Sequence, residues 1–310
     1  MGIVVFGAVF VDIKGYPENT YIPKGRNVGR IIQVHGGVAR NVAEDIANIE
    51  LRPTFVSLVD HTGMGEDVLT SLKNHKINTK YIQKTEDGMG TWIAVFDNDG
   101  DVLASISKRP DLKPLKKILE EHGDEIISQA DSVIIEFDIE KDVVKMIYAL
   151  ADKYHKDVYA LVSNMSIAVE RRQMIQHTAC FICNQQEAGI FFSDDYSSKT
   201  PEEMVDILAD NVKSARIPKM VVTMGGQGAV YASQDGDKGI CPARNVEVKD
   251  TTGAGDSFFA GVAVGLTYGK NLMDSCKIGT RLAASVISTS DNVCPRFLPS
   301  ELGLDVEVKD

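Results

Sequence analysis

Asp250-Thr251-Thr252-Gly253-Ala254-Gly255-Asp256-Ser257 is the most informative stretch of this 310-residue sequence. The alternating residues Asn245–Lys249 before it predict a strand with one buried face. The apolar run Phe258–Leu266 after it predicts a buried helix that ends at Gly269. The glycines of the stretch are therefore expected in a strand-to-helix turn. Unpaired backbone N–H groups and the positive end of a helix dipole converge at such a turn, which suits an anion.

Asp256 places a carboxylate where the anionic ligand is expected. Gly253 and Gly255, with Ala254 between them, let a phosphate approach the main chain closely. Asp256 is either an N-cap, since negative charge is stabilised at a helix start, or a general base that takes a proton from a substrate hydroxyl. In the second interpretation the amides of residues 253–256 hold the charge that builds on a transferring phosphoryl group. The turn alone favours the cap, whereas the complete string favours the base.

The string closely resembles the second signature of the PfkB (ribokinase-like) family of small-molecule kinases, D-T-T-G-A-G-D-S-F-x-A-G. In that family the Asp that matches Asp256 is the catalytic base. A Walker A loop is excluded because no Lys followed by Ser or Thr comes after Gly255. A dinucleotide fingerprint is excluded because Gly7-Ala8-Val9-Phe10 has no second or third Gly. The resemblance spans nearly the whole chain. It implies one ribokinase-like α/β domain over residues 1–310 and ATP-dependent phosphorylation of a hydroxymethyl group.

Composition limits the class of partner. The formal net charge of -11 and the pI near 5.1 argue against nucleic acid or an acidic membrane surface, so a nucleotide phosphate must be held by local amides and a metal. No apolar run approaches the length of a membrane span, and no basic region precedes the first predicted strand. Five cysteines at irregular positions suggest reduced thiols, and Cys180 and Cys183 stand in an apolar run typical of a core strand. These features predict a cytoplasmic protein with a small-molecule substrate.

Predicted strands and helices alternate along most of the chain. This alternation predicts a central, mostly parallel β-sheet flanked by helices on both faces, with the apolar run Ile3–Phe10 as a central strand. The predicted strands are Ile3–Phe10, 54–59, 132–137, 157–162, 179–183 and 220–223, and the predicted helices are 39–49, 66–75, 141–154, 201–214 and 274–288.

Two segments interrupt this alternation, at about 12–35 and 88–108. The first contains a predicted strand at Arg30–Val34. In the second, the strands 91–96 and 101–106 flank a hairpin signal at Asp97-Asn98-Asp99-Gly100. Because no helices separate these strands, we expect a small β-sheet lid whose closure excludes water and whose open edges favour a homodimer through the lid.

Gly36-Gly37-Val38-Ala39-Arg40-Asn41-Val42-Ala43 resembles the N-terminal family signature, G-G-x-x-x-N-x-A. Two glycines at a helix start expose amides, and Asn41 offers a donor and an acceptor to hydroxyls. The resemblance implies that Gly36, Gly37 and Asn41 bind the substrate, as does Asp12 at the end of the first strand. The alternatives are a plain helix start and a strand-end carboxylate. One of Glu136 and Asp138 is also expected to face the sugar, although the spacing does not decide which.

Three arginines stand near the predicted substrate-binding residues in the sequence. Arg26, Arg30 and Arg40 are interpreted as surface charges, and a basic cluster for a sugar phosphate is the alternative.

Two patterns resemble the nucleotide side of PfkB kinases. Asn184 and Glu187 form an N-x-x-E, which in the family organises Mg²⁺ and its waters; a helix cap is the alternative. Thr223-Met224-Gly225-Gly226-Gln227-Gly228 resembles T-x-G-x-x-G, whose glycines let the backbone approach ATP; a simple hairpin turn is the alternative. Thr280, in the predicted helix 274–288 of small residues, is also assigned to the nucleotide.

Asp250 and Thr252 are candidate ligands of the monovalent cation, such as K⁺, that many family members bind beside the anion hole. The loop 288–293 lacks the glycine-containing pattern that usually completes that site, which argues against a cation requirement. Asp12-Ile13-Lys14-Gly15 and the signature around Asn41 look most like the pseudouridine-kinase branch, where the acceptor is a ribosyl 5′-hydroxyl. The alternatives are a ribokinase- or fructokinase-type sugar kinase and a non-catalytic nucleotide or sugar sensor. The sequence does not identify the physiological acceptor, the oligomeric state or any regulation.

Overall fold

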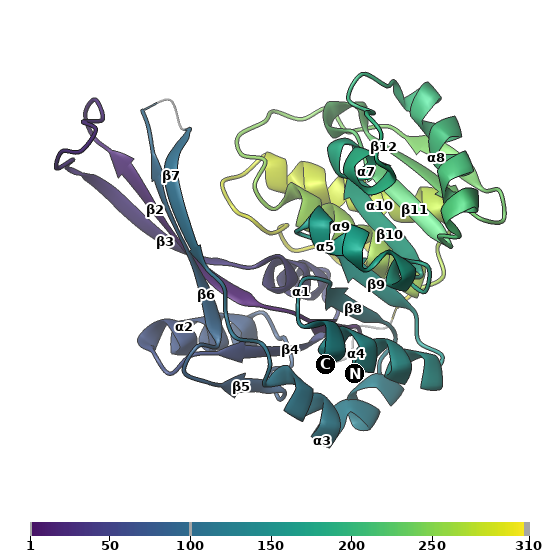
Figure 1. Cartoon of the computed structure of the whole chain (residues 1–310), viewed down its shortest axis with the longest axis horizontal. Helices are drawn as coiled ribbons and strands as arrows, with labels where there is room; N and C mark the ends of the chain where they lie inside the picture. The colour runs from purple at the N-terminus through teal and green to yellow at the C-terminus, as the bar shows by residue number, and fades with distance from the viewer. Residues whose placement is uncertain (1, 99–100, 307–310) are drawn as a thin grey trace.

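A nine-stranded sheet forms the centre of the molecule, with the strand order β13-β12-β11-β10-β9-β8-β1-β4-β5 (Figure 1). The computed structural model describes residues 2–98 and 101–306. Neighbouring strands are parallel from β5 to β11, and β12 and β13 extend the sheet as antiparallel strands. The bounds are β1 (Val4–Phe6), β4 (Thr54–Val59), β5 (Ile82–Lys84), β8 (Val133–Glu136), β9 (Val158–Leu161), β10 (Cys180–Asn184), β11 (Lys219–Thr223), β12 (Ala229–Ser233) and β13 (Lys238–Cys241).

Two hydrophobic cores cover the two faces of this sheet. Side chains alternate along each strand, so Val4 and Phe6 of β1 enter one core while Val5 enters the other. The first core is covered by α3 (Leu115–Ser128), α4 (Lys141–Lys153), α5 (Met165–Glu170), α6 (Arg172–Ile175), α7 (Gln185–Phe192) and α8 (Pro201–Ala215). The second is covered by α1 (Val38–Asn48), α2 (Gly63–Asn74), α9 (Ala254–Thr267) and α10 (Leu272–Ile287). The predicted α/β class, with a mostly parallel sheet between helical layers, is confirmed.

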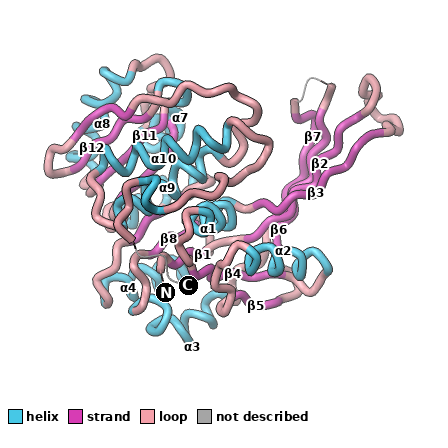
Figure 2. The backbone as a smooth tube through the Cα atoms, turned by 180° about the vertical axis from the view of Figure 1, so that it is seen from behind, coloured by secondary structure: helices cyan, strands magenta, loops and turns pink. Residues whose placement is uncertain are grey.

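A separate four-stranded sheet, which we call the lid, projects from one side of the molecule (Figures 1 and 2). Its order is β3-β2-β6-β7, with a parallel pair β2–β6 between two antiparallel pairs. The bounds are β2 (Val9–Pro17), β3 (Gly29–Gly36), β6 (Met89–Phe96) and β7 (Val102–Lys108). The two predicted segments therefore do form one small sheet. Asp99 and Gly100 of the predicted hairpin turn lie outside the described residues.

The predicted single strand Ile3–Phe10 is wrong, because the chain changes sheets within it. β1 ends at Phe6 in the central sheet, and β2 starts at Val9 in the lid. Gly7 marks the break: a Cβ at this position would stand 2.3 Å from Ala39 Cβ and 2.6 Å from Glu136 Oε2. A continuous apolar run shows that a strand is buried, but it does not show to which sheet each half belongs.

The predicted strand Asn245–Lys249 is also wrong. Residues 242–249 have no regular secondary structure, and Val248, which the alternation pattern would bury, is 64% exposed. The segment is held by a main-chain bond from Lys249 N–H to Ile287 O (2.9 Å). Short alternating patterns arise by chance in extended loops, and this one has no neighbouring strand with which to pair.

The remaining elements agree with the sequence in type, and several were not predicted. The helices α3, α5, α6 and α7 and the strands β5, β12 and β13 add to the predicted set. Two short 3₁₀ helices, η1 (Gly225–Gln227) and η2 (Pro299–Leu302), complete the assignment. Cys180 and Cys183 are buried in β10, as the core interpretation requires. Within the described part of the chain, none of the helices combines the length and apolar character needed to cross a bilayer.

Candidate active site

The first turn of α9 presents free main-chain amides. Gly253, the residue before the helix, has φ +80°, and a Cβ there would stand 2.1 Å from Asn292 O, so only glycine fits. The amide of Ala254 donates to Thr251 O at 3.2 Å. In the described residues the amides of Gly253, Gly255 and Asp256 have no hydrogen-bond acceptor, and the space beside Gly255 is open. Unpaired donors at a helix start make a site for an anion.

Asp256 lies in this first turn and is held from the other side by α1. Asn41 Nδ2 donates to Asp256 Oδ2 at 2.7 Å, a contact between positions 215 residues apart in the sequence. Burial raises the pKa of Asp256 to about 6, and the bond from Asn41 and the charge of Arg40 oppose that rise. A carboxylate with a pKa near 6 is ionised at neutral pH and is still basic enough to accept a proton.

Arg40 is a buried part of this site and not the surface charge that was predicted. Its side chain is 2% exposed, and it pairs with Glu44 Oε2 at 2.7 Å. It also donates to Asn41 Oδ1 and to the main-chain carbonyl of His35 (2.6 Å). The prediction failed because an arginine in a helical pattern is usually solvated. The Glu four residues later was the available signal, since residues i and i+4 share one helix face.

The residues predicted to bind the sugar gather around the start of α1, which contacts Asp256 through Asn41. The Asp12 carboxylate lies over Gly36, where a Cβ would stand 2.7 Å from either carboxylate oxygen. Burial raises the pKa of Asp12, while Lys14 and Arg40 oppose the rise. Gly37 begins α1 with φ +99°, and a Cβ there would stand 2.7 Å from Ala8 O. Asn41 uses both ends of its amide, Nδ2 on Asp256 and Oδ1 on Arg40, which leaves one N–H for a ligand.

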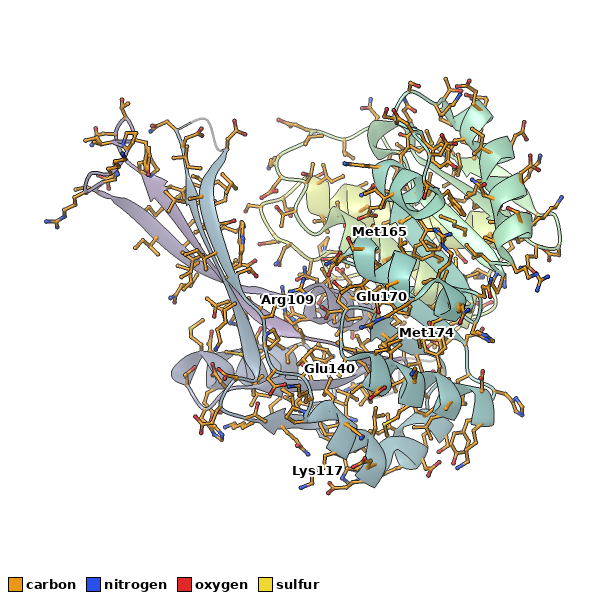
Figure 3. All side chains as sticks on the ribbon, viewed as in Figure 1. Arg109, Lys117, Glu140, Met165, Glu170 and Met174 are labelled. Atoms are coloured by element: carbon orange, nitrogen blue, oxygen red, sulfur yellow. The ribbon has the colours of Figure 1, made fainter. Side chains whose placement is uncertain are left out.

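Glu136 and Asp138 stand at the end of β8, and both are part of this cluster. Glu136 Oε2 accepts the Ala8 N–H at 2.8 Å. Burial raises the pKa of Glu136 to about 7, helped by the charges of Asp138 and Asp256 and opposed by Arg109. Asp138 accepts Ser163 Oγ at 2.7 Å, and its buried Oδ1 has no partner among the described residues. Arg109, which follows the lid strand β7 and is labelled in Figure 3, also opposes the rise in the pKa of Asp138 that burial causes.

Asp45 is a buried carboxylate of the candidate site that was not predicted from the sequence. It is completely buried, and it accepts Ser257 Oγ at 2.8 Å and Cys294 N–H at 2.6 Å. Burial raises its pKa to about 7. The carboxylate therefore ties α1 to the first turn of α9 and to the loop before the C-terminal segment. Its position four residues after Asn41, on the same helix face, was the available sequence signal.

Asn184 and Glu187 form a capping box at the start of α7. Asn184 Oδ1 accepts the Glu187 N–H at 2.8 Å, and Glu187 Oε2 accepts the Asn184 N–H at 2.8 Å. The cap alternative is thus present in the structure. The other carboxylate oxygen, Glu187 Oε1, takes no part in the capping box. Glu187 itself stands in the first turn of α7, directly after the carboxyl end of β10.

Thr223-Met224-Gly225-Gly226-Gln227-Gly228 forms the hairpin that joins β11 to β12. A Cβ at Gly225 or Gly226 would meet nothing within 4 Å, whereas a Cβ at Gly228 would stand 2.2 Å from Cys241 O. Gly228 is therefore required by packing, and the other two glycines leave open space. Thr280 on α10 is buried, and its hydroxyl lies 3.6 Å from Cys241 Sγ. Their roles toward a nucleotide remain predictions.

The loop that carries the cation candidates Asp250 and Thr252 lies against the 288–294 loop. Asp250 Oδ1 accepts the Thr252 N–H at 2.8 Å. Burial raises the pKa of Asp250, but this bond and the charge of Lys14 outweigh burial and lower it. The 288–294 loop reaches the same place, because Asn292 O packs on Gly253 and Asn292 Nδ2 donates to His35 O at 3.1 Å. Among the described residues, no group of three or more His, Cys, Asp or Glu side chains is arranged to hold a metal ion.

The comparison with known families decides the identification. The family described as pfkB family carbohydrate kinase matches residues 2–293. The chain belongs to the PfkB family. It is a kinase that uses ATP and acts on a hydroxyl group of a sugar or nucleoside, as the family resemblance implied.

Two curated relatives and one solved structure of PfkB kinases are similar to this chain over most of its length. Guanosine-inosine kinase from Exiguobacterium acetylicum is 35% identical over 292 residues, which cover 94% of this chain and 95% of that protein. Pseudouridine kinase from Escherichia coli is 23% identical over 291 residues, with coverage of 92% and 90%. The structure of Arabidopsis thaliana ribokinase complexed with ribose and ATP has a TM-score of 0.84 at 18% identity and covers 95% of each chain. This last likeness shows the fold.

Proposed function

We propose that the protein phosphorylates the 5′-hydroxyl of a purine ribonucleoside of the guanosine or inosine type, with ATP as donor. The observation that carries this proposal is the 35% identity to a guanosine-inosine kinase across 94% of the chain, which includes both the lid and the first turn of α9. The pseudouridine acceptor favoured by the sequence motifs is the second candidate, because a pseudouridine kinase is 23% identical over a similar length. Both candidates share the ribosyl 5′-hydroxyl.

The inner face of the lid supports a nucleoside over a free sugar. Trp92, the one tryptophan of the chain, pairs with Asp12 across β2 and β6, so the two side chains share a face. Lys14 shares that face and acts on Asp250, so this face is directed at the α9 turn. Trp92 and Phe96 meet edge to face at 6.4 Å, and Phe96 stacks on Tyr16 at 4.7 Å.

Phe10 extends this aromatic row toward the base of the lid, since its ring lies over Gly90. A row of rings beside the sugar-binding carboxylate offers π-faces on which a purine base stacks. Ribose or fructose would leave these rings without a partner. The lid therefore fits an acceptor that carries a planar base.

Asp256 acts as the general base in this proposal. It takes the proton of the 5′-hydroxyl while that oxygen forms a bond to the γ-phosphorus, and the bond from phosphorus to the bridging oxygen breaks so that ADP leaves. The free amides of Gly253, Gly255 and Asp256 stabilise the negative charge on the phosphoryl oxygens. Asp12 and the free N–H of Asn41 hold the ribose hydroxyls.

Mg²⁺ fits beside Asn184 and Glu187. The oxygen of Glu187 outside the capping box is a hard ligand, and one carboxylate together with waters and phosphate oxygens matches the preference of Mg²⁺. When bound, Mg²⁺ supplies charge neutralisation between the phosphates. The open space at Gly225 and Gly226 gives the nucleotide room on the same side of the sheet.

The outer face of the lid fits a second copy of the chain. Ile93 and Ile106 pair directly, Ile31 shares their face on β3, and the three side chains are 44%, 73% and 74% exposed. An apolar patch of this kind marks an interface in a water-soluble enzyme. Pairing of two lids would cover these side chains and leave each inner face directed at its own active site.

A panel of acceptors tests the proposed function. ADP release is measured with inosine, guanosine, adenosine, pseudouridine, ribose and fructose, and the products are identified by mass spectrometry. We expect ADP and a nucleoside 5′-monophosphate with inosine and guanosine. ADP with pseudouridine alone would establish the second candidate, and ADP with ribose or fructose but no nucleoside would overturn both.

A further inference from the structure

We propose that Arg40 is the residue that positions the catalytic base, by fixing the side-chain amide of Asn41 in the orientation that binds Asp256. The inference rests on the proposed role of Asp256. Arg40 itself touches neither the acceptor nor the reacting atoms. It acts through Asn41, and it is therefore a positioning residue.

The orientation of Asn41 follows from the chemistry of its two neighbours. A guanidinium can only donate hydrogen bonds, so the atom of Asn41 that faces Arg40 must be the carbonyl oxygen. The other end of the amide is then the NH₂ group, which donates to Asp256 Oδ2 at 2.7 Å. A reversed amide would place two donors against each other at Arg40 and two acceptors against each other at Asp256.

Fixing Asn41 also fixes which oxygen of Asp256 is available. With Oδ2 occupied by Asn41, Oδ1 is the carboxylate oxygen that remains to take the proton of the acceptor hydroxyl. A free asparagine side chain would release Asp256 to rotate. A general base must lie within hydrogen-bond reach of the proton that it removes, so this rotation would be costly.

Arg40 is itself held by three other groups, which is why it can orient Asn41. Its Nη1 pairs with Glu44 at 2.7 Å, its Nε donates to Gly36 O at 3.2 Å, and its Nη2 donates to His35 O at 2.6 Å. Both charged side chains are nearly inaccessible to solvent. A buried ion pair is weak evidence for stability, but it can specify one arrangement.

Two of these bonds reach the end of the lid strand β3, which terminates at Gly36. The same guanidinium therefore contacts the lid and, through Asn41, the base. A lysine cannot reproduce this set, because one ammonium on a flexible stem lacks the planar fork of five donors.

The charge of Arg40 has a second effect on Asp256. The charged groups that surround this carboxylate are Arg40 and Asp45 on α1 and Glu136 on β8. Arg40 opposes the rise in the pKa of Asp256, whereas the two carboxylates repel its negative charge. Removal of the positive charge would move the acid limb of the pH–rate profile to higher pH.

Two variants separate geometry from charge. Arg40→Lys keeps the charge but loses the fork, so we expect kcat to fall by about 10²-fold, with an acid limb like that of the wild type. Arg40→Met/Glu44→Met removes both buried charges together, so no unpaired charge is left inside the protein. For this double variant we expect a similar fall in kcat and an acid limb at higher pH. The KM for ATP should be unchanged in both.

The control is Arg172→Ala. Arg172 also donates to a main-chain carbonyl, that of Phe191, and stacks on its ring at 4.8 Å, far from Asp256 in the fold. We expect a lower unfolding temperature with unchanged kcat and pH profile. If the folded Arg40 variants also keep wild-type kcat and pH profile, Arg40 is merely structural and the inference is overturned.

Asp256→Asn, measured in parallel, separates the inference from the proposed function. If Asp256→Asn keeps turnover, the base assignment fails, and the inference fails with it. If Asp256→Asn loses turnover but both Arg40 variants keep it, only the inference fails. Loss of turnover in all three variants, with a shifted acid limb in the double variant alone, supports both.

Discussion

The central sheet and the lid both carry β-branched residues in their strands but are covered very differently. Apart from the edge strand β5, the parallel strands of the central sheet lie between two helical layers, and β4 and β8 are buried along their full length. In the lid, by contrast, β7 is exposed at every residue, and β3 is exposed at half of its residues. Strands of β-branched and aromatic residues usually need such cover.

This contrast shows where each part of the function lies. The central sheet positions Glu136, Asp138 and, through α9, Asp256, so the proposed phosphoryl chemistry depends on packed elements. The lid carries Asp12 and the aromatic row on one face and bare isoleucines on the other. Its two uncovered faces are explained if the acceptor covers the inner face and a second copy covers the outer one.

The largest expected effect belongs to the central sheet. Asp256→Asn should keep the fold and ATP binding but lower kcat by about 10² to 10⁴, the usual worth of a general base, because an amide does not accept the hydroxyl proton. Steady-state ADP release and a thermal melt measure both properties. Turnover close to that of the wild type would remove Asp256 from the role of base.

The contribution of burial to the free energy of unfolding can be compared by substituting one residue in each sheet. Phe181→Ala in β10 should lower the free energy of unfolding by about 3 to 5 kcal/mol, because its buried ring packs on Phe191 at 5.1 Å. Ile106→Ser, at an exposed position of β7, should change it by less than about 0.5 kcal/mol. Denaturant titration at a low protein concentration measures both. A large loss for Ile106→Ser under these conditions would mean that the lid is covered within one chain.

Acceptor selection should depend on the lid. Trp92→Ala should raise the KM for inosine by about 5- to 150-fold, since stacking on one ring contributes about 1–3 kcal/mol per base. Leu103→Ala, at a 44% exposed position of the lid edge, is the matched control and should leave that KM unchanged. An unaltered KM in Trp92→Ala would place the base elsewhere.

The pH dependence of the reaction tests Asp256, on the side of the central sheet. Burial raises the pKa of Asp256 to about 6, so below that pH the carboxyl is protonated and cannot accept a proton. The value of kcat/KM should therefore fall about tenfold per pH unit below pH 6, as expected for one essential ionised group. Initial rates from pH 4.5 to about 8 measure this. If kcat/KM does not fall within this range, the limb lies nearer the ordinary aspartate value of 3.8, and Asp256 is not a buried essential base in the free enzyme.

The smallest expected change is in oligomeric state. Ile31→Asp/Ile106→Asp places charges in the outer face of the lid and should convert a dimer into a monomer, because like charges would face each other across the paired lids. Light scattering measures the mass. Leu298→Asp, at another exposed apolar position away from the lid, should keep the wild-type mass. A wild-type monomer would contradict the proposed lid contact.

Much of the fold and of the candidate site could be predicted because the informative residues are local in sequence. The turn 250–257 and the signature 36–43 each join one helix start to a glycine-rich segment, and the βα alternation follows from short-range periodicity. The structure adds that the two segments meet, through Asn41 and Asp256.

What could not be predicted depends on contacts between distant segments. Arg40 looks like a solvated helix residue because its local partners, Glu44 and the carbonyl of His35, do not reveal that the packed fold buries it. Asp45 acquires its partners from Ser257 and Cys294, more than 200 residues away. The break at Gly7 has the same origin, because Ala39 and Glu136 leave no room there for a side chain.

The position of β1 has a consequence for the order in which the chain folds. Val4–Phe6 pairs with β4 on one side and with β8 on the other, and β2, which follows directly, pairs with β3 and β6. During synthesis the edge of β1 that pairs with β8 therefore stays unpaired until Val133–Glu136 has left the ribosome. Non-local pairing of this kind slows folding and exposes a strand edge in the meantime. The nascent lid, whose strands are all made before β8, is the earliest sheet that the chain can complete.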